Sequence, residues 1–162
     1  MSRKSPAVTL LWMYTGKNAP ARREQIRAWR PANFAVVEAD PKLGWCRAIQ
    51  GVTKETDIFV LWMDDDKPVS HDFLHQMTQP LIVREEFGVV MHFWSGNAVS
   101  VHKKTLDASP IKDDHAGGPS LLKLLVPVLD AADKRSGGRV RLALSSTERL
   151  APLTMEPVGF PS

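Results

Sequence analysis

The stretch IFVLWMDDDKP, residues 58–68, is the most informative part of this sequence. Its first six residues are apolar and rich in β-branched and aromatic side chains, and charge followed by Pro68 ends the run. The pattern predicts a buried strand that leads into a loop. Three adjacent carboxylates, Asp64, Asp65 and Asp66, repel one another, so they make a poor turn unless a cation lies in front of them. Mg²⁺ and Mn²⁺ prefer such oxygen ligands, often together with substrate phosphates. The stretch therefore predicts a metal site, with a solvated acidic loop as the alternative.

The whole sequence has 162 residues, the length of a single domain with a substantial core. A content of 43% hydrophobic and 24% charged residues is typical of soluble globular proteins. No apolar run reaches the roughly 20 residues that cross a bilayer, and no signal-like segment is present. The single cysteine, Cys46, excludes an intramolecular disulfide and a cysteine-cluster zinc site. We expect one cytoplasmic domain over residues 1–162, with a core over about 7–145 and an irregular, proline-containing tail over about 150–162.

The charge is unevenly distributed along the chain. The net charge of +3 is too small to indicate nucleic acid binding on its own, and we expect no nucleic acid partner. Residues 1–30 contain seven Arg and Lys against one acid, Glu24, whereas residues 57–72 are acidic. This division suits a metal flanked by cations that hold phosphates. Solvated charged faces are the alternative, and they are the more common origin of such clusters.

Apolar periodicity predicts alternating strands and helices. Such alternation is typical of a three-layer α/β/α sandwich with a mostly parallel central sheet. Ligands of these sheets bind outside the carboxyl ends of the strands. The expected strands cover 7–14, 34–39, 57–63, 87–94, 97–101 and, as an edge strand, 139–144; the expected helices cover 20–29, 43–54, 70–82 and 119–134. The helix over 70–82 is expected to bury one stripe of side chains, namely Phe73, Leu74, Met77 and Leu81.

Polar residues follow the first three expected strands. Thr15 and Gly16 follow the first strand, Asp40 the second, and the Asp64–Asp66 triplet the third. Because parallel strands end at one edge of the sheet, we expect these residues to line a common cleft. Asp40 could accept hydrogen bonds from a bound ligand, or it could form the turn before Pro41.

Several motifs together resemble the nucleotide-sugar domain of GT-A-fold glycosyltransferases, especially the family 2 type. The segment LGWCRAIQG (43–51) precedes the strand that ends in Asp-x-Asp, and SGNAVSVHKKTL (95–106) follows it. Asp113 and Asp114 then precede a long helix that Gly137-Gly138 closes. The resemblance covers roughly residues 7–145 and depends on the order and spacing of these motifs.

The resemblance implies transfer of a sugar from a nucleoside-diphosphate sugar to an unknown acceptor. It places Mn²⁺ or Mg²⁺ on Asp64, Asp65 and Asp66, with Asp66 as the main ligand, where the ion stabilises the departing diphosphate. It also places the nucleotide against Thr15 and Gly16, and against Asp40 and Asp64. Lys17, Arg22 and Arg23 could hold the diphosphate, but exposed helix charges are the more common role of such residues.

The resemblance makes Asp114, or Asp113, the base that deprotonates the acceptor hydroxyl. The alternative is that both acids open the following helix and complement its dipole. Two other functions also stay open. One is a partial, non-catalytic nucleotide-binding module, because the family's Gln-x-x-Arg-Trp segment is absent and Asp-Asp replaces its Glu-Asp. The acceptor side is incomplete in a chain of this length, and a second copy of the chain could complete it as a homodimer. The other is a haloacid dehalogenase-type phosphohydrolase with Asp64 as nucleophile, although Pro68 stands where that family has Thr or Val.

Overall fold

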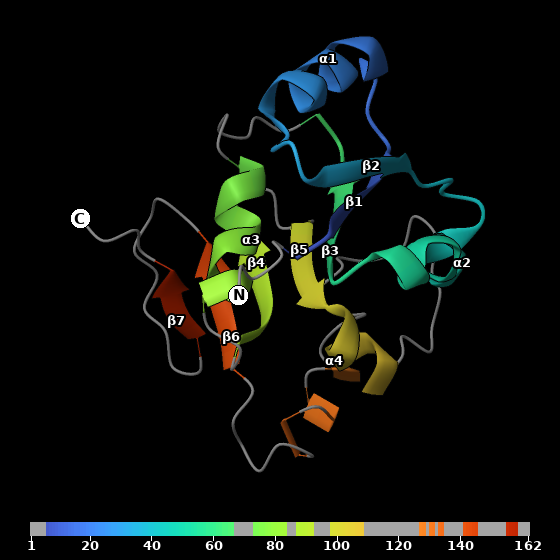
Figure 1. Ribbon diagram of the computed structural model, residues 1–162. Helices are drawn as coiled ribbons and strands as arrows, with labels where there is room; N and C mark the ends of the chain where they lie inside the picture. Colours follow the sequence, from blue (N-terminus) through green and yellow to red (C-terminus); the bar gives the residue numbers. More distant parts are fainter. Residues whose placement is uncertain are drawn as a thin grey trace.

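The computed structural model describes residues 6–66, 73–83, 87–92, 98–108, 127–128, 130–131, 133–134, 141–145 and 155–158 (Figure 1). Its strands are β1 Val8–Tyr14, β2 Phe34–Glu38, β3 Ile58–Asp64, β4 Phe87–His92, β5 Ala98–His102, β6 Arg141–Ser145 and β7 Met155–Val158. Its helices are α1 Ala19–Trp29, α2 Gly44–Val52, α3 Phe73–Val83 and α4 Lys103–Ala108, with a 3₁₀ turn at Thr53–Glu55. The described residues between 127 and 134 are also helical.

The strands form one seven-stranded sheet in the order β2-β1-β3-β5-β4-β6-β7 (Figure 1). Only β5 runs against its neighbours, β3 and β4. The other pairings are parallel: β1 pairs with β2 and with β3, and β6 pairs with β4 and with β7. The predicted mostly parallel sheet is therefore confirmed. Tyr14 and Asp64, the last residues of β1 and β3, are partners in the register, so these two strands end side by side.

Helices cover both faces of the sheet, which confirms the predicted three-layer arrangement (Figure 1). On one face, even-numbered residues of β1 and β3, such as Leu10 and Val60, pack against Ile26 of α1 and the apolar side of α3. On the other face, odd-numbered residues such as Leu11 and Leu61 pack against α2 and α4. This division follows from the alternation of side chains along a strand. The predicted buried stripe of α3 is confirmed, because Phe73, Leu74, Met77 and Leu81 are at most 1% exposed.

Two predictions for the C-terminal part of the chain are wrong. The segment 139–144 was expected at the edge of the sheet, but β6 lies between β4 and β7. The tail from about 150 was expected to be irregular, but it contributes strand β7. β7 is only four residues long and includes Pro157, so it carries almost no periodicity that a sequence pattern could reveal. Its place at the edge explains why proline is tolerated, since among the described strands β7 pairs with β6 alone.

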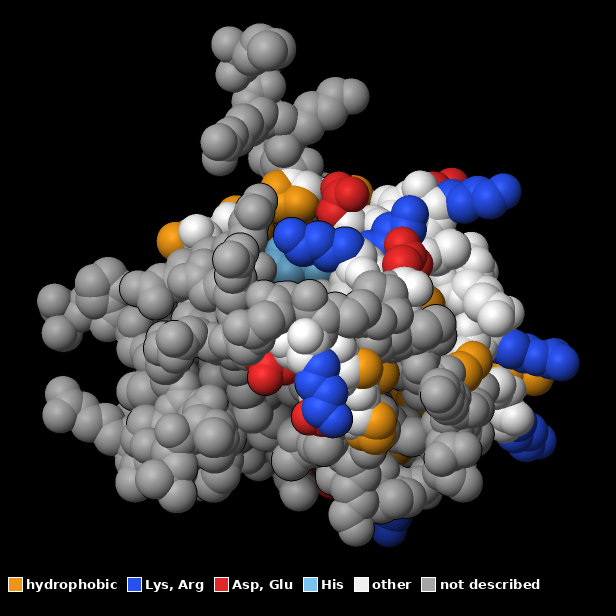
Figure 2. Space-filling view, turned by 90° about the horizontal axis from the view of Figure 1, so that it is seen from below, with side chains coloured by type: hydrophobic (Ala, Val, Ile, Leu, Met, Phe, Trp, Pro, Cys, Tyr) orange, Lys and Arg blue, Asp and Glu red, His pale blue; other side chains and the backbone are white. Residues whose placement is uncertain are grey.

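In the part of the chain that the structure describes, no helix combines the length and the apolar character needed to span a membrane. On the face shown in Figure 2, basic and acidic side chains of the described residues lie interspersed.

Candidate functional site

The candidate site lies where β1 and β3 end, and backbone hydrogen bonds continue the pairing of these strands into the loop. The Thr15 N–H donates to the carbonyl oxygen of Asp64 at 2.7 Å, and the Thr15 hydroxyl donates to the same oxygen at 3.1 Å. β2 ends beside them, because the Ala39 N–H donates to the Trp12 carbonyl at 2.8 Å. The first residues after the strands are thus fixed by the sheet itself.

Asp64 is directed into the protein. Its side chain is 1% exposed, and its Oδ2 accepts a hydrogen bond from the indole Nε1 of Trp12 at 2.8 Å. The same oxygen forms an ion pair with Nε of Arg22, also at 2.8 Å, and Arg22 is itself only 6% exposed. A buried carboxylate requires such partners, because an unpaired charge would carry a large desolvation cost.

The second oxygen of Asp64 shapes the loop. Its Oδ1 accepts a hydrogen bond from the backbone N–H of Asp66 at 2.9 Å, the local pattern by which aspartate stabilises a turn two residues ahead. Asp66 has a φ of 70°, in the left-handed region that aspartate tolerates better than most residues. Asp64 thus holds the backbone of Asp66 in the position from which the Asp66 side chain reaches Tyr14 and Lys17.

Asp66 lies at the surface with two donors on its carboxylate. The Tyr14 hydroxyl donates to Oδ1 at 2.5 Å, and the Lys17 N–H donates to Oδ2 at 2.6 Å. The Tyr14 hydroxyl in turn accepts a hydrogen bond from the Asn18 N–H. The Tyr14 bond first, and then the Lys17 bond, hold the pKa of Asp66 below its usual range. Desolvation first, and then the bond to Asp66, raise the pKa of Tyr14.

Gly16 makes room for this carboxylate. A Cβ at position 16 would lie 2.7 Å from Oδ1 of Asp66 and nearer still to its Cγ and Oδ2. Distances under 3.0 Å are essentially never seen for a real Cβ. The absence of a side chain at Gly16 is therefore what allows Asp66 to reach the backbone of the loop after β1.

Aromatic rings and guanidinium groups support the site from the side of α1. The Arg22 guanidinium lies 4.9 Å from the centroid of the Trp62 ring, and that of Arg23 lies 5.7 Å from the Trp12 ring. The rings of Trp12 and Tyr14 are 5.1 Å apart. Cations in such positions are attracted to the ring faces. These contacts link α1 to the ends of β1 and β3.

The structure brings Thr15, Gly16, Asp64 and Asp66 together, as predicted for the shared edge of the sheet. The predicted cluster of three carboxylates is not formed, because Asp64 turns inward to Arg22. Within the described residues, no group of three or more His, Cys, Asp or Glu side chains could hold a metal. Of the triplet, Asp65 and Asp66 are the exposed residues.

The remaining predicted residues are not part of this cluster in the described contacts. The side chain of Asp40 accepts a hydrogen bond from the Lys42 N–H at 2.9 Å, and its carbonyl accepts from the Leu43 N–H at 3.0 Å. Asp40 thus forms the turn that leads into α2, which was the alternative reading of its sequence. Asp113 and Asp114, the predicted catalytic base, lie outside the described residues.

Two residues of the site were not recognised from the sequence. Trp12 was treated only as part of a strand, and an exposed helix charge was considered the more common role for Arg22. Tyr14 was expected beside Thr15 and Gly16 at the shared edge of the sheet, but without a contact to Asp66. A signal was available for Arg22, because it precedes the buried Ile26 by four residues and so lies on the same face of α1. The strand alternation places Trp12 and Tyr14 on that face as well.

The arrangement of this chain is similar to solved structures of glucosyl-3-phosphoglycerate synthase from Mycobacterium tuberculosis. The structure of that protein with Mn²⁺, uridine diphosphate and phosphoglyceric acid matches 91% of this chain and 72% of its own, with a TM-score of 0.59 and 11% identity. Its structure with Mg²⁺ and uridine diphosphate gives a TM-score of 0.59 at 11% identity over 91% and 73% of the two chains. The structure with Mn²⁺, uridine-diphosphate-glucose and phosphoglyceric acid gives the same values.

No family model matches this sequence, and no curated protein matches it. The structural similarity at 11% identity concerns the fold. The chain has the GT-A fold of these glycosyltransferases, a mostly parallel sheet between layers of helices.

Proposed function

We propose that this chain binds a nucleoside-diphosphate sugar together with Mn²⁺ or Mg²⁺ at the ends of β1 and β3, and transfers the sugar to an acceptor. The observation that carries this proposal is the Asp66 carboxylate. It is exposed, its pKa is lowered, and it is held over Gly16 at the edge of the sheet where ligands of α/β proteins bind.

The residues present fit a hard divalent cation. Asp65 and Asp66 offer exposed carboxylate oxygens on one loop, and Mg²⁺ sites commonly use one or two carboxylates and complete the shell with water and substrate phosphates. A divalent ion at this position supplies Lewis-acid stabilisation of a departing diphosphate. Asp64 and Arg22 serve as positioning residues, because they fix the turn that presents Asp66.

The solved structures of the mycobacterial synthase support this proposal, because that protein was crystallised with Mn²⁺ or Mg²⁺ and with uridine diphosphate. We assign Thr15 and Gly16 to nucleotide binding, because they form the loop after β1 that lies against Asp66. Asp114, or Asp113, as the base that activates the acceptor, Asp40 as a nucleotide contact, and the likeness to the family 2 type in particular stay predictions.

The test is thermal unfolding with Mn²⁺ and uridine diphosphate, added singly and together. We expect stabilisation that needs both ligands, since a ligand at 100 times its Kd adds about 2.7 kcal/mol to the stability of the folded state. Asp66→Asn should abolish the effect, whereas Asp107→Asn, at an exposed acid on α4, should leave it intact. If neither uridine nor guanosine diphosphate with Mn²⁺ raises the midpoint, the proposal fails.

A nucleotide-binding module without transfer is the second candidate. It is favoured by the withdrawal of Asp64 into the ion pair with Arg22, which leaves two exposed carboxylates in the triplet. Release of uridine diphosphate from uridine-diphosphate-glucose separates the two functions. Ligand-dependent stabilisation with no release of the diphosphate in the presence of small hydroxylated acceptors would favour the module.

A further inference from the structure

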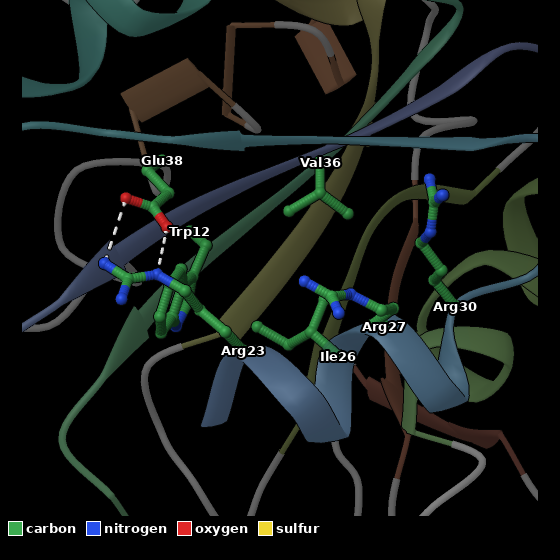
Figure 3. Close-up of a pocket in the computed structure, with 7 residues that line it drawn as sticks. All are labelled: Trp12, Arg23, Ile26, Arg27, Arg30, Val36 and Glu38. Carbon is green, nitrogen blue, oxygen red and sulfur yellow. Dashed lines mark hydrogen bonds and ion pairs between the residues drawn. The ribbon is translucent and has the colours of Figure 1, made fainter. Parts of the chain in front are cut away.

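A hollow lies beside the candidate site, between α1 and the edge strand β2 (Figure 3). It has a volume of about 160 Å³. None of Thr15, Gly16 or the Asp64–Asp66 loop lines it. Its size is below the roughly 300–1,000 Å³ of sites for drug-sized ligands, so only a small molecule fits.

The floor of this cavity is apolar. Trp12 and Ile26 line it and are only 2% and 3% exposed, and the partly buried Val36 packs against the same core. In Figure 3, Ile26 points from α1 toward Val36 on β2. Because so little of Trp12 and Ile26 meets water, the gain in free energy comes mainly from the apolar atoms of the ligand, which leave water when they enter the cavity.

The rim of the cavity is basic. Arg23 and Arg27 lie four residues apart on α1, and Arg30 follows directly after the helix, so all three come from one side of it. Glu38 at the end of β2 is the acid among the lining residues, which leaves two positive charges in excess. A ligand that is both apolar and anionic therefore matches the lining.

The three guanidinium groups are not equivalent. Arg23 is paired with Glu38 through Nε and, at 3.3 Å, through a second nitrogen (Figure 3). Arg27 pairs through Nη1 with the exposed Glu24 at 3.1 Å, and Nη1 of Arg30 donates to the Phe34 carbonyl at 2.8 Å. A guanidinium has five N–H donors, so one such contact leaves others for a ligand. Arg27 and Arg30 are thus the residues suited to bind an anion.

We propose that this cavity binds a small organic carboxylate with an apolar body, of the size of benzoate. The apolar body lies against Trp12, Ile26 and Val36, and the carboxylate accepts hydrogen bonds from Arg27 and Arg30. Trp12 also donates to Asp64, so the occupant touches a residue that belongs to the candidate site. The proposal does not depend on nucleotide or metal binding.

The test is a titration of protein carrying ¹³C-labelled isoleucine methyl groups with sodium benzoate, followed by NMR without metal or nucleotide. We expect the Ile26 δ1 methyl signal, assigned with Ile26→Val, to shift saturably under the ring current of the ligand. The Ile49 signal, from α2 on the opposite face of the sheet, should stay in place. Arg27→Gln should weaken the affinity about tenfold, as loss of a charge-assisted hydrogen bond does.

Matched controls make the outcome decisive. Arg47→Gln removes an exposed arginine from α2 and should leave the affinity for benzoate unchanged. Benzamide, which has the same ring without the charge, should bind at least tenfold more weakly than benzoate. The proposal is overturned if benzoate does not move the Ile26 signal, if Arg27→Gln binds benzoate like Arg47→Gln, or if benzamide binds as tightly as benzoate.

Discussion

The hydrogen bond from the Tyr14 hydroxyl is the largest cause of the lowered pKa of Asp66. Tyr14→Phe removes the largest cause of the lowered pKa, so we expect the pKa of Asp66 to rise toward its ordinary value. Side-chain carboxyl ¹³C shifts of Asp66, followed against pH in both proteins, measure the change.

The sign of the accompanying stability change follows from the direction of the shift. Because the pKa of Asp66 is lower in the folded state, its contribution to stability is present above the pKa of an unfolded aspartate, about 3.9. The contribution is lost as the pH falls through the folded-state pKa. Tyr14→Phe should thus lower stability at neutral pH and make it less dependent on pH in acid. An unchanged Asp66 titration in the variant would show that Tyr14 does not set this pKa.

Gly16→Ala is expected to displace the Asp66 carboxylate from Tyr14 and Lys17, because the new Cβ would occupy its place. Asp66 is exposed, so the unliganded protein should lose about 1 kcal/mol or less, while stabilisation by Mn²⁺ with uridine diphosphate should disappear. Thermal unfolding with and without ligands measures both effects.

Gly51→Ala is the matched control for Gly16→Ala. A Cβ at position 51, near the end of α2, meets nothing within 4 Å, so the variant should gain up to about 0.5–1 kcal/mol of stability and keep its response to ligands. A Gly16→Ala protein that still responds fully to Mn²⁺ and nucleotide would contradict the role given to the close contact.

Substitution of one member of the buried ion pair between Arg22 and Asp64 should strongly lower the stability of the protein. Asp64→Asn removes the negative charge that lies against the buried Arg22 guanidinium, so we expect a loss of about 3–5 kcal/mol in urea unfolding. Arg27→Met, which removes the exposed pair with Glu24, should cost at most about 1 kcal/mol. Equal losses for the two variants would show that burial of the Arg22 pair does not determine its contribution.

At the scale of elements, α3 depends on one apolar face. Leu81 is 1% exposed in the core between α3 and the sheet, so Leu81→Ala should destabilise the protein by about 2–5 kcal/mol. Val83 ends the same helix at 69% exposure, and Val83→Ala should change stability by no more than about 0.5 kcal/mol. Chemical denaturation of both variants tests whether the face predicted from periodicity carries the packing.

Most elements were predictable because their signals are local. A few neighbouring residues are enough to predict β1 and β3 from their apolar runs. The same holds for α3, whose apolar residues Phe73, Leu74, Met77 and Leu81 recur at helical spacing. β7 has no such local pattern, and because β7 was not predicted, β6 was taken for the edge strand. The same reason explains the inward turn of Asp64. Its partners Trp12 and Arg22 are distant in sequence, and only the parallel pairing of β1 and β3 brings them to it.

In the molecule as a whole, the four residues of β7 form one edge of the sheet and pair with β6. Deleting residues 155–162 would expose the β6 edge, and an uncovered edge strand favours pairing with other chains. We expect lower stability in urea and self-association by size-exclusion chromatography with light scattering. Deleting only 159–162, which lie beyond β7, should leave both properties unchanged. A monomeric, fully stable 155–162 deletion would show that β7 is dispensable.

The contact between Gly16 and Asp66 also constrains how this sequence can evolve. Because the carboxylate lies where a side chain at position 16 would begin, alanine at 16 and the present placement of the Asp66 carboxylate exclude each other. Asp66 is exposed, so a lineage that acquires alanine at 16 keeps its fold and gives up only the placement of that carboxylate. Selection for soluble protein alone should therefore tolerate alanine at 16, whereas selection for ligand binding that begins from Gly16→Ala should recover reversion to glycine. Glycine at this position is then retained for the ligand and not for the fold.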